Sequence, residues 1–439
     1  MFIRSSLAGG VMLLLSTFAH AQHVITVDSN LGTANVAGAC TLRDAIQAIN
    51  DLAPRGGCPA GDGYGDDTIV ISISGQPAVI TLTQADPGLF NGTAFPGAGL
   101  PPIGRTLTIL GNYATIRRDP ALACPLNGSA AASEFRLLHV LPSGDAFVRD
   151  ITLLNGCADD AGSTGNGGAI RNEGYLELVS GLAELSEANY GGGAIQSSGT
   201  LVLIDFTLAH NSASAFGGGI FSSGTTNIFG SALVNNTAGS QGGGGIYVNA
   251  GYTQILNSTL ALNSTTGPGG AIAYNILAGS GTLSLVHATV AHNNSTYFAP
   301  SGVYASNTGA GLLQIKNSLI AANGNVNCSF SGAPGTAVIG ANLSSDNTCT
   351  GFSLSNTNPW LGSFAGNGGW TANYALLIAS PAIDAVTDCT RVDGTPVSVD
   401  QRGFARPINA TGKPAAHCDI GAFEEDPGFI FGDGFNVIY

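Results

Sequence analysis

Short hydrophobic phrases recur at a nearly fixed period between Gly165 and Asn323. Each phrase reads Gly-Gly-(Ala/Gly)-Ile and precedes a polar turn, and successive isoleucines lie 25 or 26 residues apart. The isoleucines are Ile170, Ile195, Ile220, Ile246 and Ile272, and Val303 continues the series after 31 residues. A fixed period of this length predicts a repeat protein. A disordered glycine-rich tract is the alternative, but disorder does not require a constant register.

A second series, of asparagines, runs inside the first and ends short apolar segments such as FTLAHN and SALVNN. Its members are Asn211, Asn236, Asn263, Asn293 and Asn323. The runs between glycine and asparagine are rich in Leu, Ile, Val and Thr and are too short for helices, so they predict strands. With two or three strands per period, the chain is predicted to be all-β and to fold as a parallel β-helix. Glycine and asparagine suit its sharp turns, and stacked asparagines can hydrogen-bond from coil to coil.

The pattern also predicts how the chain is divided. The predicted order is a signal peptide (1–21), an N-terminal cap (22–67), the β-helix solenoid (68–345), a C-terminal cap (346–426) and a tail (427–439). Arg4, an apolar core and an Ala-His-Ala cleavage site mark the signal, and no later segment has 18 consecutive apolar residues. In TLRDAIQAIN, Thr41 and Asp44 form a capping-box pattern, so we expect a short helix that covers the open sheet edge. An exported protein without a transmembrane segment is expected, extracellular or at the cell surface.

Eight cysteines agree with an oxidising destination. Eight cysteines allow 105 pairings, so the sequence alone leaves the connectivity open. Neighbours in sequence bracket loops of plausible size, and we therefore favour the pairs Cys40–Cys58, Cys124–Cys157, Cys328–Cys349 and Cys389–Cys418.

Several motifs resemble those of exported bacterial proteins. CTLRDAIQAIN looks like the N-terminal motif of CSLREA-domain proteins, and SPAIDA, DQRGFARP and CDIGAFEED resemble the choice-of-anchor Q region. The GGAI phrases are similar to repeats of chlamydial polymorphic outer-membrane proteins. The resemblance implies a right-handed β-helix of the pectin-lyase-like kind, adhesion as a function, and a structural role for Asp66 and Asp67.

Charge limits the classes of partner. The net charge is −14, only 10% of residues are charged, and no basic stripe is present, so we expect no nucleic-acid partner. No cofactor is expected either. The run GDGYGDD leaves Ca²⁺ at Asp62, Asp66 and Asp67 as an open alternative, although it lacks the spacing of an EF-hand loop.

Candidate catalytic groups are few. Residues 206–315 contain no Asp, Glu, Lys or Arg, and His210 and His292 lie three coils apart, too far to share a metal. The best candidates are the carboxylates Asp150, Glu184 and Asp205 with Arg171 or Arg149 as basic partner. Glu184 and Asp205 could lie on neighbouring coils as a carboxylate pair, but we favour a solvated charged face as the explanation of these residues.

Two functions stay open from the sequence. One is a non-catalytic rod that binds glycans or surfaces, with tyrosines available to stack on sugars: Tyr247, Tyr252, Tyr274 and Tyr304. The other is a polysaccharide lyase or glycoside hydrolase, by analogy of fold alone. The charged residues of the C-terminal motifs are expected to lock the cap onto the last coil: Asp384, Asp388, Asp400, Arg402, Arg406, Asp419 and Glu424.

Overall fold

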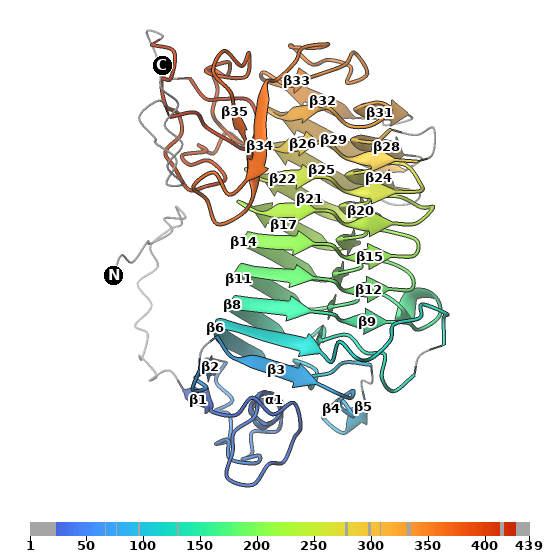
Figure 1. Cartoon of the computed structure of the whole chain (residues 1–439), viewed down its shortest axis with the longest axis vertical. Coiled ribbons are helices and arrows are strands. Elements are labelled where there is room, and N and C mark those ends of the chain that lie inside the picture. The colour runs from blue at the N-terminus through green and yellow to red at the C-terminus, as the bar shows by residue number, and fades with distance from the viewer. Residues whose placement is uncertain are drawn as a thin grey trace.

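The structure is a computed structural model. It describes residues 23–426 apart from 66, 76, 95–96, 130, 277–279, 297–299, 308, 332–334 and 413–416. Strands dominate and stack in parallel into a tall solenoid (Figure 1), which confirms the predicted parallel β-helix. The predicted signal peptide, the tail and Asp66 lie outside the described residues. Among the residues described, no helix has the length and apolar character needed to cross a membrane.

Three parallel sheets form the walls of the solenoid. The large sheet contains β1 (Val24–Val27), β2 (Thr68–Ile71), β3 (Val79–Leu82), β6 (Thr106–Arg118), β8 (Asp145–Leu154), β11 (Tyr175–Glu184), β14 (Thr200–Ala209), β17 (Thr225–Phe229), β18 (Ala232–Val234), β21 (Gly251–Leu256), β22 (Thr259–Ala261), β25 (Ser280–Val286), β26 (Thr289–Ala291), β29 (Ala310–Lys316), β30 (Leu319–Ala321), β32 (Thr336–Ile339) and β33 (Leu343–Ser344). The second sheet contains β7 (Leu138–Val140), β10 (Ile170–Asn172), β13 (Ile195–Ser197), β16 (Ile220–Ser222), β20 (Ile246–Val248), β24 (Ile272–Ile276), β28 (Val303–Asn307) and β31 (Cys328–Ser331). The third contains β9 (Cys157–Ala158), β12 (Glu187–Ala188), β15 (Ser212–Ala213), β19 (Thr237–Ala238), β23 (Ser264–Thr265) and β27 (Asn294–Ser295).

The isoleucine series forms a buried column inside the second sheet. Ile170 pairs with Ile195, Ile195 with Ile220, and the register continues through Ile246 and Ile272 to Val303. All six side chains have no exposed surface. The glycine three residues before each isoleucine has positive φ, as at Gly217, where an added Cβ would lie 2.0 Å from the Ile220 carbonyl oxygen. The repeated phrase therefore encodes one inward side chain and one turn per coil.

The asparagine series forms a continuous hydrogen-bond ladder. Asn211 donates through Nδ2 to Oδ1 of Asn236 at 2.9 Å, and Asn236 donates likewise to Asn263 at 3.0 Å. The ladder continues through Asn293 and Asn323 with distances of 2.9 Å. Each Oδ1 also accepts the backbone N–H of the preceding asparagine, so amides that are almost fully buried are satisfied.

Both ends of the solenoid are covered. Helix α1 (Leu42–Asp51) packs on β1 and β2, and Thr41 caps it by accepting the N–H of Asp44. Strand β1 itself pairs with β2, so the first rung begins within the segment predicted as the cap. At the other end Leu354 bridges Leu343. A 3-10 turn (Gly162–Thr164) and two hairpins complete the description: β4 (Leu89–Phe90) with β5 (Thr93–Ala94), and β34 (Leu361–Ala365) with β35 (Asn373–Leu376).

Four disulfides join the pairs favoured from the sequence: Cys40–Cys58, Cys124–Cys157, Cys328–Cys349 and Cys389–Cys418. The first lies at the N-terminal cap, the second ties the insertion after β6 to β9, and the third ties β31 to the chain beyond the last coil. The fourth lies in the C-terminal region. Each therefore anchors a segment that leaves the regular repeat.

The C-terminal chain from 359 to 426, here called the flank segment, runs along the side of the solenoid (Figure 1). Gln401 accepts from Thr259 at 2.6 Å, and Ala422 donates its N–H to Thr289 at 3.0 Å. Lys316 reaches Asp388 at 2.8 Å. These contacts involve several coils, so the prediction that the charged motifs only lock a cap onto the last coil was too narrow.

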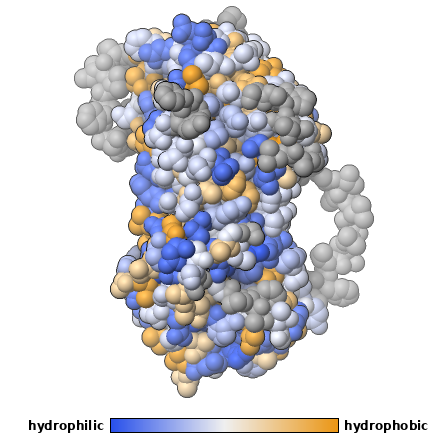
Figure 2. Space-filling view, turned by 90° about the vertical axis from the view of Figure 1, so that its right-hand side faces the viewer, coloured by the Kyte–Doolittle hydropathy of each residue, from blue (hydrophilic) through white to orange (hydrophobic). Residues whose placement is uncertain are grey.

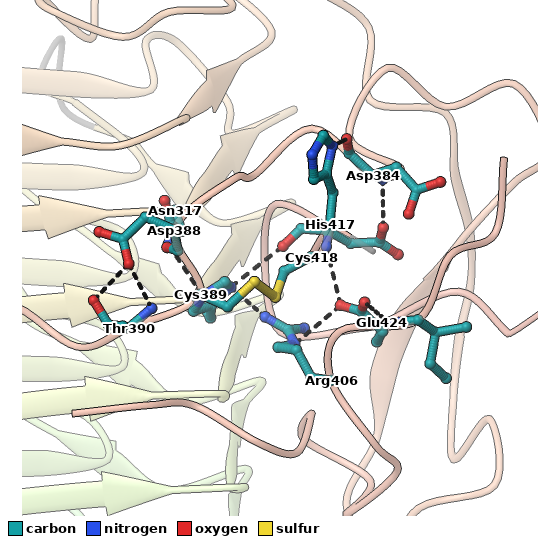
Figure 3. Close-up of a disulfide and its surroundings, with 12 residues drawn as sticks. Asn317, Asp384, Asp388, Cys389, Thr390, Arg406, His417, Cys418 and Glu424 are labelled. Atoms are coloured by element: carbon teal, nitrogen blue, oxygen red, sulfur yellow. Dashed lines mark hydrogen bonds and ion pairs between the residues drawn. A yellow bond between two sulfur atoms is a disulfide. The ribbon is translucent and has the colours of Figure 1, made fainter. Parts of the chain in front are cut away.

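Buried charges hold the flank segment together. Arg406 and Glu424 have no exposed side-chain surface, and Nε of Arg406 lies 3.0 Å from Oε2 of Glu424. Arg402 forms a second buried pair with Asp400 at 2.7 Å. Figure 3 shows the arginine and Glu424 beside the Cys389–Cys418 disulfide, with Asn317 of the solenoid bonded to the same segment.

Candidate functional site

One corner of the large sheet carries a row of residues in the left-handed conformation. Adjacent coils are in register there, and these residues have φ between 46° and 59°. The row, here called the first corner, is Asp150, Ser180, Asp205, Gly230, Asn257, His287 and Asn317. Glycine, asparagine and aspartate enter this conformation at low cost, which suits a sharp bend between two strand segments.

The upper half of the first corner is covered by the flank segment. Thr371 donates to the carbonyl oxygen of Gly230 at 2.7 Å. Asn257 donates to the carbonyl oxygen of Val399 at 2.6 Å, and Asn317 donates to that of Asp388 at 2.8 Å. In this half Asn257 and Asn317 therefore donate to the backbone of the covering chain, whereas Gly230 accepts through its carbonyl oxygen and His287 lies against the guanidinium of Arg406.

The lower half of the first corner, beyond the part that the flank segment covers, forms an open pocket of about 190 Å³. Asp150, Ser180 and Asp205 line it together with Tyr113 and Trp370. Trp370 comes from the flank segment and is 73% exposed, while Tyr113 comes from the bulge of β6 and is 62% exposed. Two exposed aromatic rings thus line one pocket together with hydroxyl and carboxylate groups; we call this the corner pocket.

The electrostatics of the corner pocket are acidic. Asp150 and Asp205 occupy the same corner two coils apart, about 10 Å by two rungs of about 4.8 Å. Partial burial raises the pKa of Asp150, and Arg149 opposes this rise. The guanidinium of Arg149 lies 3.3 Å from Glu177. The described lining residues include no Lys, Arg or His.

The other two catalytic candidates lie elsewhere. Glu184 is level with Ala209, four residues beyond Asp205, and accepts from His210 at 3.0 Å. Asp205 and Glu184 therefore belong to different corners, and the structure does not bring them together as a pair. It brings together Asp150 and Asp205 instead, with Ser180 between them.

Arg171 lies on the second sheet in a cluster with His139 and Glu173. Arg171 approaches Glu173 at 2.6 Å, and Nε2 of His139 lies 3.1 Å from the same carboxylate. The hydrogen bond from His139, with that from Arg171, lowers the pKa of Glu173 to about 2. Burial lowers the pKa of His139 itself, so the neutral imidazole donates its Nε2–H. This cluster is remote from the corner pocket.

Glu173→Gln is expected to lower the free energy of unfolding by about 1–2 kcal/mol at pH 7, after allowance for solvent screening. Because the folded pKa lies below the usual value of 4.5, the stabilisation is present above pH 4.5 and is lost as pH falls toward 2. Denaturant unfolding across this window should show wild type and variant converging. Glu177→Gln, which removes the exposed pair with Arg149, is the control and should change stability by less than about 0.5 kcal/mol. A constant difference down to pH 2 would contradict this account.

The acidic loop at GDGYGDD is held by ordinary hydrogen bonds in the part described. Oδ1 of Asp67 lies 2.6 Å from Nδ1 of His23 and accepts the N–H of Asp62 at 3.2 Å. Asp66 lies outside the described residues. Within the described ranges, no group of three or more His, Cys, Asp or Glu side chains is placed to hold a metal ion.

The tyrosines predicted as sugar platforms have different environments. Tyr274 is fully buried and donates to the carbonyl oxygen of Gly281 at 2.8 Å, so that prediction was wrong for this residue. Tyr247 is only 2% exposed and packs edge-on against Phe216, so the prediction was wrong for this residue too. Tyr252 is 38% exposed and Tyr304 is half-buried. Figure 2 shows the face that lies on the right-hand side of Figure 1. On this face hydrophobic residues form small groups separated by hydrophilic ones.

A larger pocket, of about 480 Å³, lies at the next corner of the large sheet. Uncharged groups line it, including His292, Asn356 and Asn358. His292 packs against Tyr374 with ring centroids 5.2 Å apart, and burial lowers its pKa. This pocket is roomier, but it combines neither exposed aromatic rings nor carboxylates, so the corner pocket is the better functional candidate.

The sequence reasoning missed Tyr113, Ser180 and Trp370. A signal exists for part of the corner, because five of its seven residues lie six positions before a ladder asparagine, as Asp205 does before Asn211 and Asn257 before Asn263; Asp150 and Ser180 do not. Comparisons of the chain with family models, curated proteins and solved structures found no match.

Proposed function

We propose that the protein is an exported, non-catalytic β-helix that binds glycans, and that the corner pocket is the binding site. The observation that carries this proposal is that two exposed rings, Tyr113 and Trp370, line the same pocket as Asp150, Ser180 and Asp205. Aromatic rings stack on the apolar faces of sugars, and carboxylates and hydroxyls accept hydrogen bonds from sugar hydroxyls.

The size of the pocket favours a polymer that is bound from the outside. Pockets that enclose whole drug-sized ligands usually measure about 300–1,000 Å³. The corner pocket measures about 190 Å³ and opens on the side of a rod. One sugar unit would enter it while neighbouring units lie along the solenoid, which suits attachment to a polysaccharide or a cell-surface glycan.

An exported location supports such a role. Four disulfides are compatible with an oxidising compartment. The signal-like residues 1–21 and the resemblance to exported β-helix proteins lead to the same expectation. Adhesion through surface glycans is the function that combines these features.

Trp370→Ala is expected to weaken binding about five- to thirtyfold, since a stacked aromatic anchor contributes on the order of 1–2 kcal/mol. A glycan array followed by calorimetry on residues 22–439 provides the ligand and the affinity. Trp360→Ala is the matched control, because Trp360 is also exposed on the flank segment but does not line the corner pocket. Equal binding by wild type and Trp370→Ala, or an equal loss in Trp360→Ala, would refute the site.

A second candidate function is an inverting glycoside hydrolase. It is favoured by the spacing of Asp150 and Asp205, near the range for an acid and a base that share a water molecule, and by the raised pKa of Asp150. A reducing-end assay on a polysaccharide panel, with Ca²⁺ and with EDTA, separates the two functions. Cleavage that disappears in Asp150→Asn and Asp205→Asn would establish the enzyme. A lyase is less well supported, because the described lining residues offer no basic proton acceptor.

A further inference from the structure

We propose that a second pocket, at the N-terminal cap, binds a neutral sugar unit through the buried charged groups of Arg43 and Asp86. The pocket measures about 300 Å³ and is lined by helix α1, the loop before it and the chain that follows β3; we call it the cap pocket. It shares no lining residue with the corner pocket. The inference therefore goes beyond the function proposed above, and either site can exist without the other.

The strongest argument is an ion pair that is buried but not closed. The side chains of Arg43 and Asp86 are only 2% and 8% exposed, yet Nη1 of Arg43 lies 3.7 Å from Oδ2 of Asp86, too far for a hydrogen bond. The other ends of the two groups are held by the backbone: Nη2 of Arg43 donates to the carbonyl oxygen of Gln84, and Oδ1 of Asp86 accepts the N–H of Gly88 at 2.9 Å.

The remaining polar atoms of this pair lack partners within the part of the chain that the structure describes. Nη1 of Arg43 and Oδ2 of Asp86 form no hydrogen bond there, and the buried Nε of Arg43 has no partner either. Buried charged groups are costly unless they are fully paired and hydrogen-bonded. A ligand that completes these bonds would therefore gain affinity from a penalty that the folded chain already carries.

The missing partners define the chemistry of the ligand. Nη1 of Arg43 requires an acceptor, and Oδ2 of Asp86, a short distance away, requires a donor. A hydroxyl group is both donor and acceptor, so adjacent hydroxyls of a sugar can accept from the guanidinium and donate to the carboxylate. Both bonds would involve an ionised group, which makes them stronger than bonds between neutral groups.

The rest of the lining favours a neutral ligand. Two arginines, Arg43 and Arg55, line the pocket together with two aspartates, Asp44 and Asp86, so the charges of the described lining balance. Neither a uronate nor an amino sugar would meet an excess of the opposite charge. Leu89, which is 45% exposed, adds an apolar surface for the C–H groups of a sugar ring.

Calorimetry on residues 22–439 carrying Trp370→Ala tests the cap pocket, because this variant removes an aromatic ring from the corner pocket. Neutral tetrasaccharides of glucose, galactose and mannose are the probes, and at least one should bind. Asp86→Asn should weaken this binding about tenfold, since it removes the charged acceptor but keeps an oxygen for the N–H of Gly88. Asp119→Asn is the matched control: Asp119 also accepts an N–H from two residues later, but it lies outside the cap pocket.

A second variant blocks the cap pocket and leaves its charged groups in place. Ala34 is an exposed lining residue of the loop before α1, so Ala34→Trp should fill the pocket and abolish binding without lowering the unfolding temperature. Ala37→Trp is the control, because Ala37 is exposed in the same loop but does not line the pocket. Binding that persists in Ala34→Trp would overturn the proposal even if Asp86→Asn proved unstable.

The outcomes separate the cap pocket from the corner pocket. Binding that is equal in wild type and Trp370→Ala but lost in Ala34→Trp would refute the corner pocket and support the cap pocket. Failure of every neutral probe to bind Trp370→Ala would overturn the cap pocket, whether or not wild type binds through the corner pocket, and would mean that water completes the ion pair. Tighter binding of the glucuronic acid or glucosamine tetrasaccharides would overturn the choice of a neutral ligand.

Discussion

Asn263→Ala is expected to lower the free energy of unfolding by about 3–5 kcal/mol. The side chain of Asn263 accepts two hydrogen bonds from Asn236 and donates to Asn293 and to the carbonyl oxygen of Leu233. Alanine would leave these buried partners unsatisfied in the middle of the ladder and would open a small cavity. Denaturant unfolding followed by circular dichroism measures the loss.

Asn235→Ala is a suitable control for this prediction. Asn235 occupies the neighbouring turn with φ of 54° and is half-buried, outside the ladder. Its replacement should cost only about 1 kcal/mol, the price of placing alanine in the left-handed conformation. Similar losses in the two variants would show that the ladder contributes no more than an ordinary turn residue.

The ladders are the part of the fold that the sequence predicts well. Ile170 and its successors, and Asn211 and its successors, each repeat one physical requirement per coil, so the period is visible without any knowledge of long-range contacts. The disulfides were also accessible, because each closes a loop between cysteines that are neighbours in sequence.

The corner pocket could not be predicted in the same way. Its floor changes chemistry from Asp150 to Ser180 to Asp205, so it has no composition signature. Trp370 reaches it only because the flank segment returns along the solenoid, through contacts such as that between Asn257 and Val399, 142 residues apart. Glu184 and Asp205 do lie on neighbouring coils, as predicted, but they lie at different corners of the solenoid.

The position of Trp370 links the stability of the flank segment to binding. The segment is fixed through buried charges, and Glu424 depends on Arg406 for compensation. Burial raises the pKa of Glu424, and the attraction of Arg406 opposes that rise. Loss of the arginine would therefore leave a carboxylate that must either stay charged in the interior or take up a proton.

Arg406→Met is consequently expected to lower the free energy of unfolding by about 3–5 kcal/mol at pH 7 and to loosen the flank segment. Without Arg406, the pKa of Glu424 rises further above its usual value. The folded variant therefore takes up a proton at Glu424 as pH falls through that pKa, and the loss in free energy of unfolding becomes smaller. Limited proteolysis of residues 359–426 and denaturant unfolding at several pH values measure both effects. Oligosaccharide binding should weaken in parallel, because Trp370 belongs to the loosened chain.

Arg406→Met combined with Glu424→Gln tests the cause. Glutamine is neutral and keeps one carbonyl oxygen, which can accept the N–H of Ile408 or that of Asp419 but not both. The double variant should therefore recover part of the lost stability and lose the part of the pH dependence that comes from Glu424. Arg55→Met is the control, since Arg55 forms an exposed pair with Asp51 and its loss should cost less than about 1 kcal/mol. A double variant no more stable than Arg406→Met would mean that the arginine acts through its contacts with His287 and the Gly421 carbonyl oxygen instead. In that case the flank segment would be attached to the solenoid chiefly at the first corner. Weaker oligosaccharide binding in Arg406→Met would then result from the lost contact with His287 rather than from the lost ion pair with Glu424.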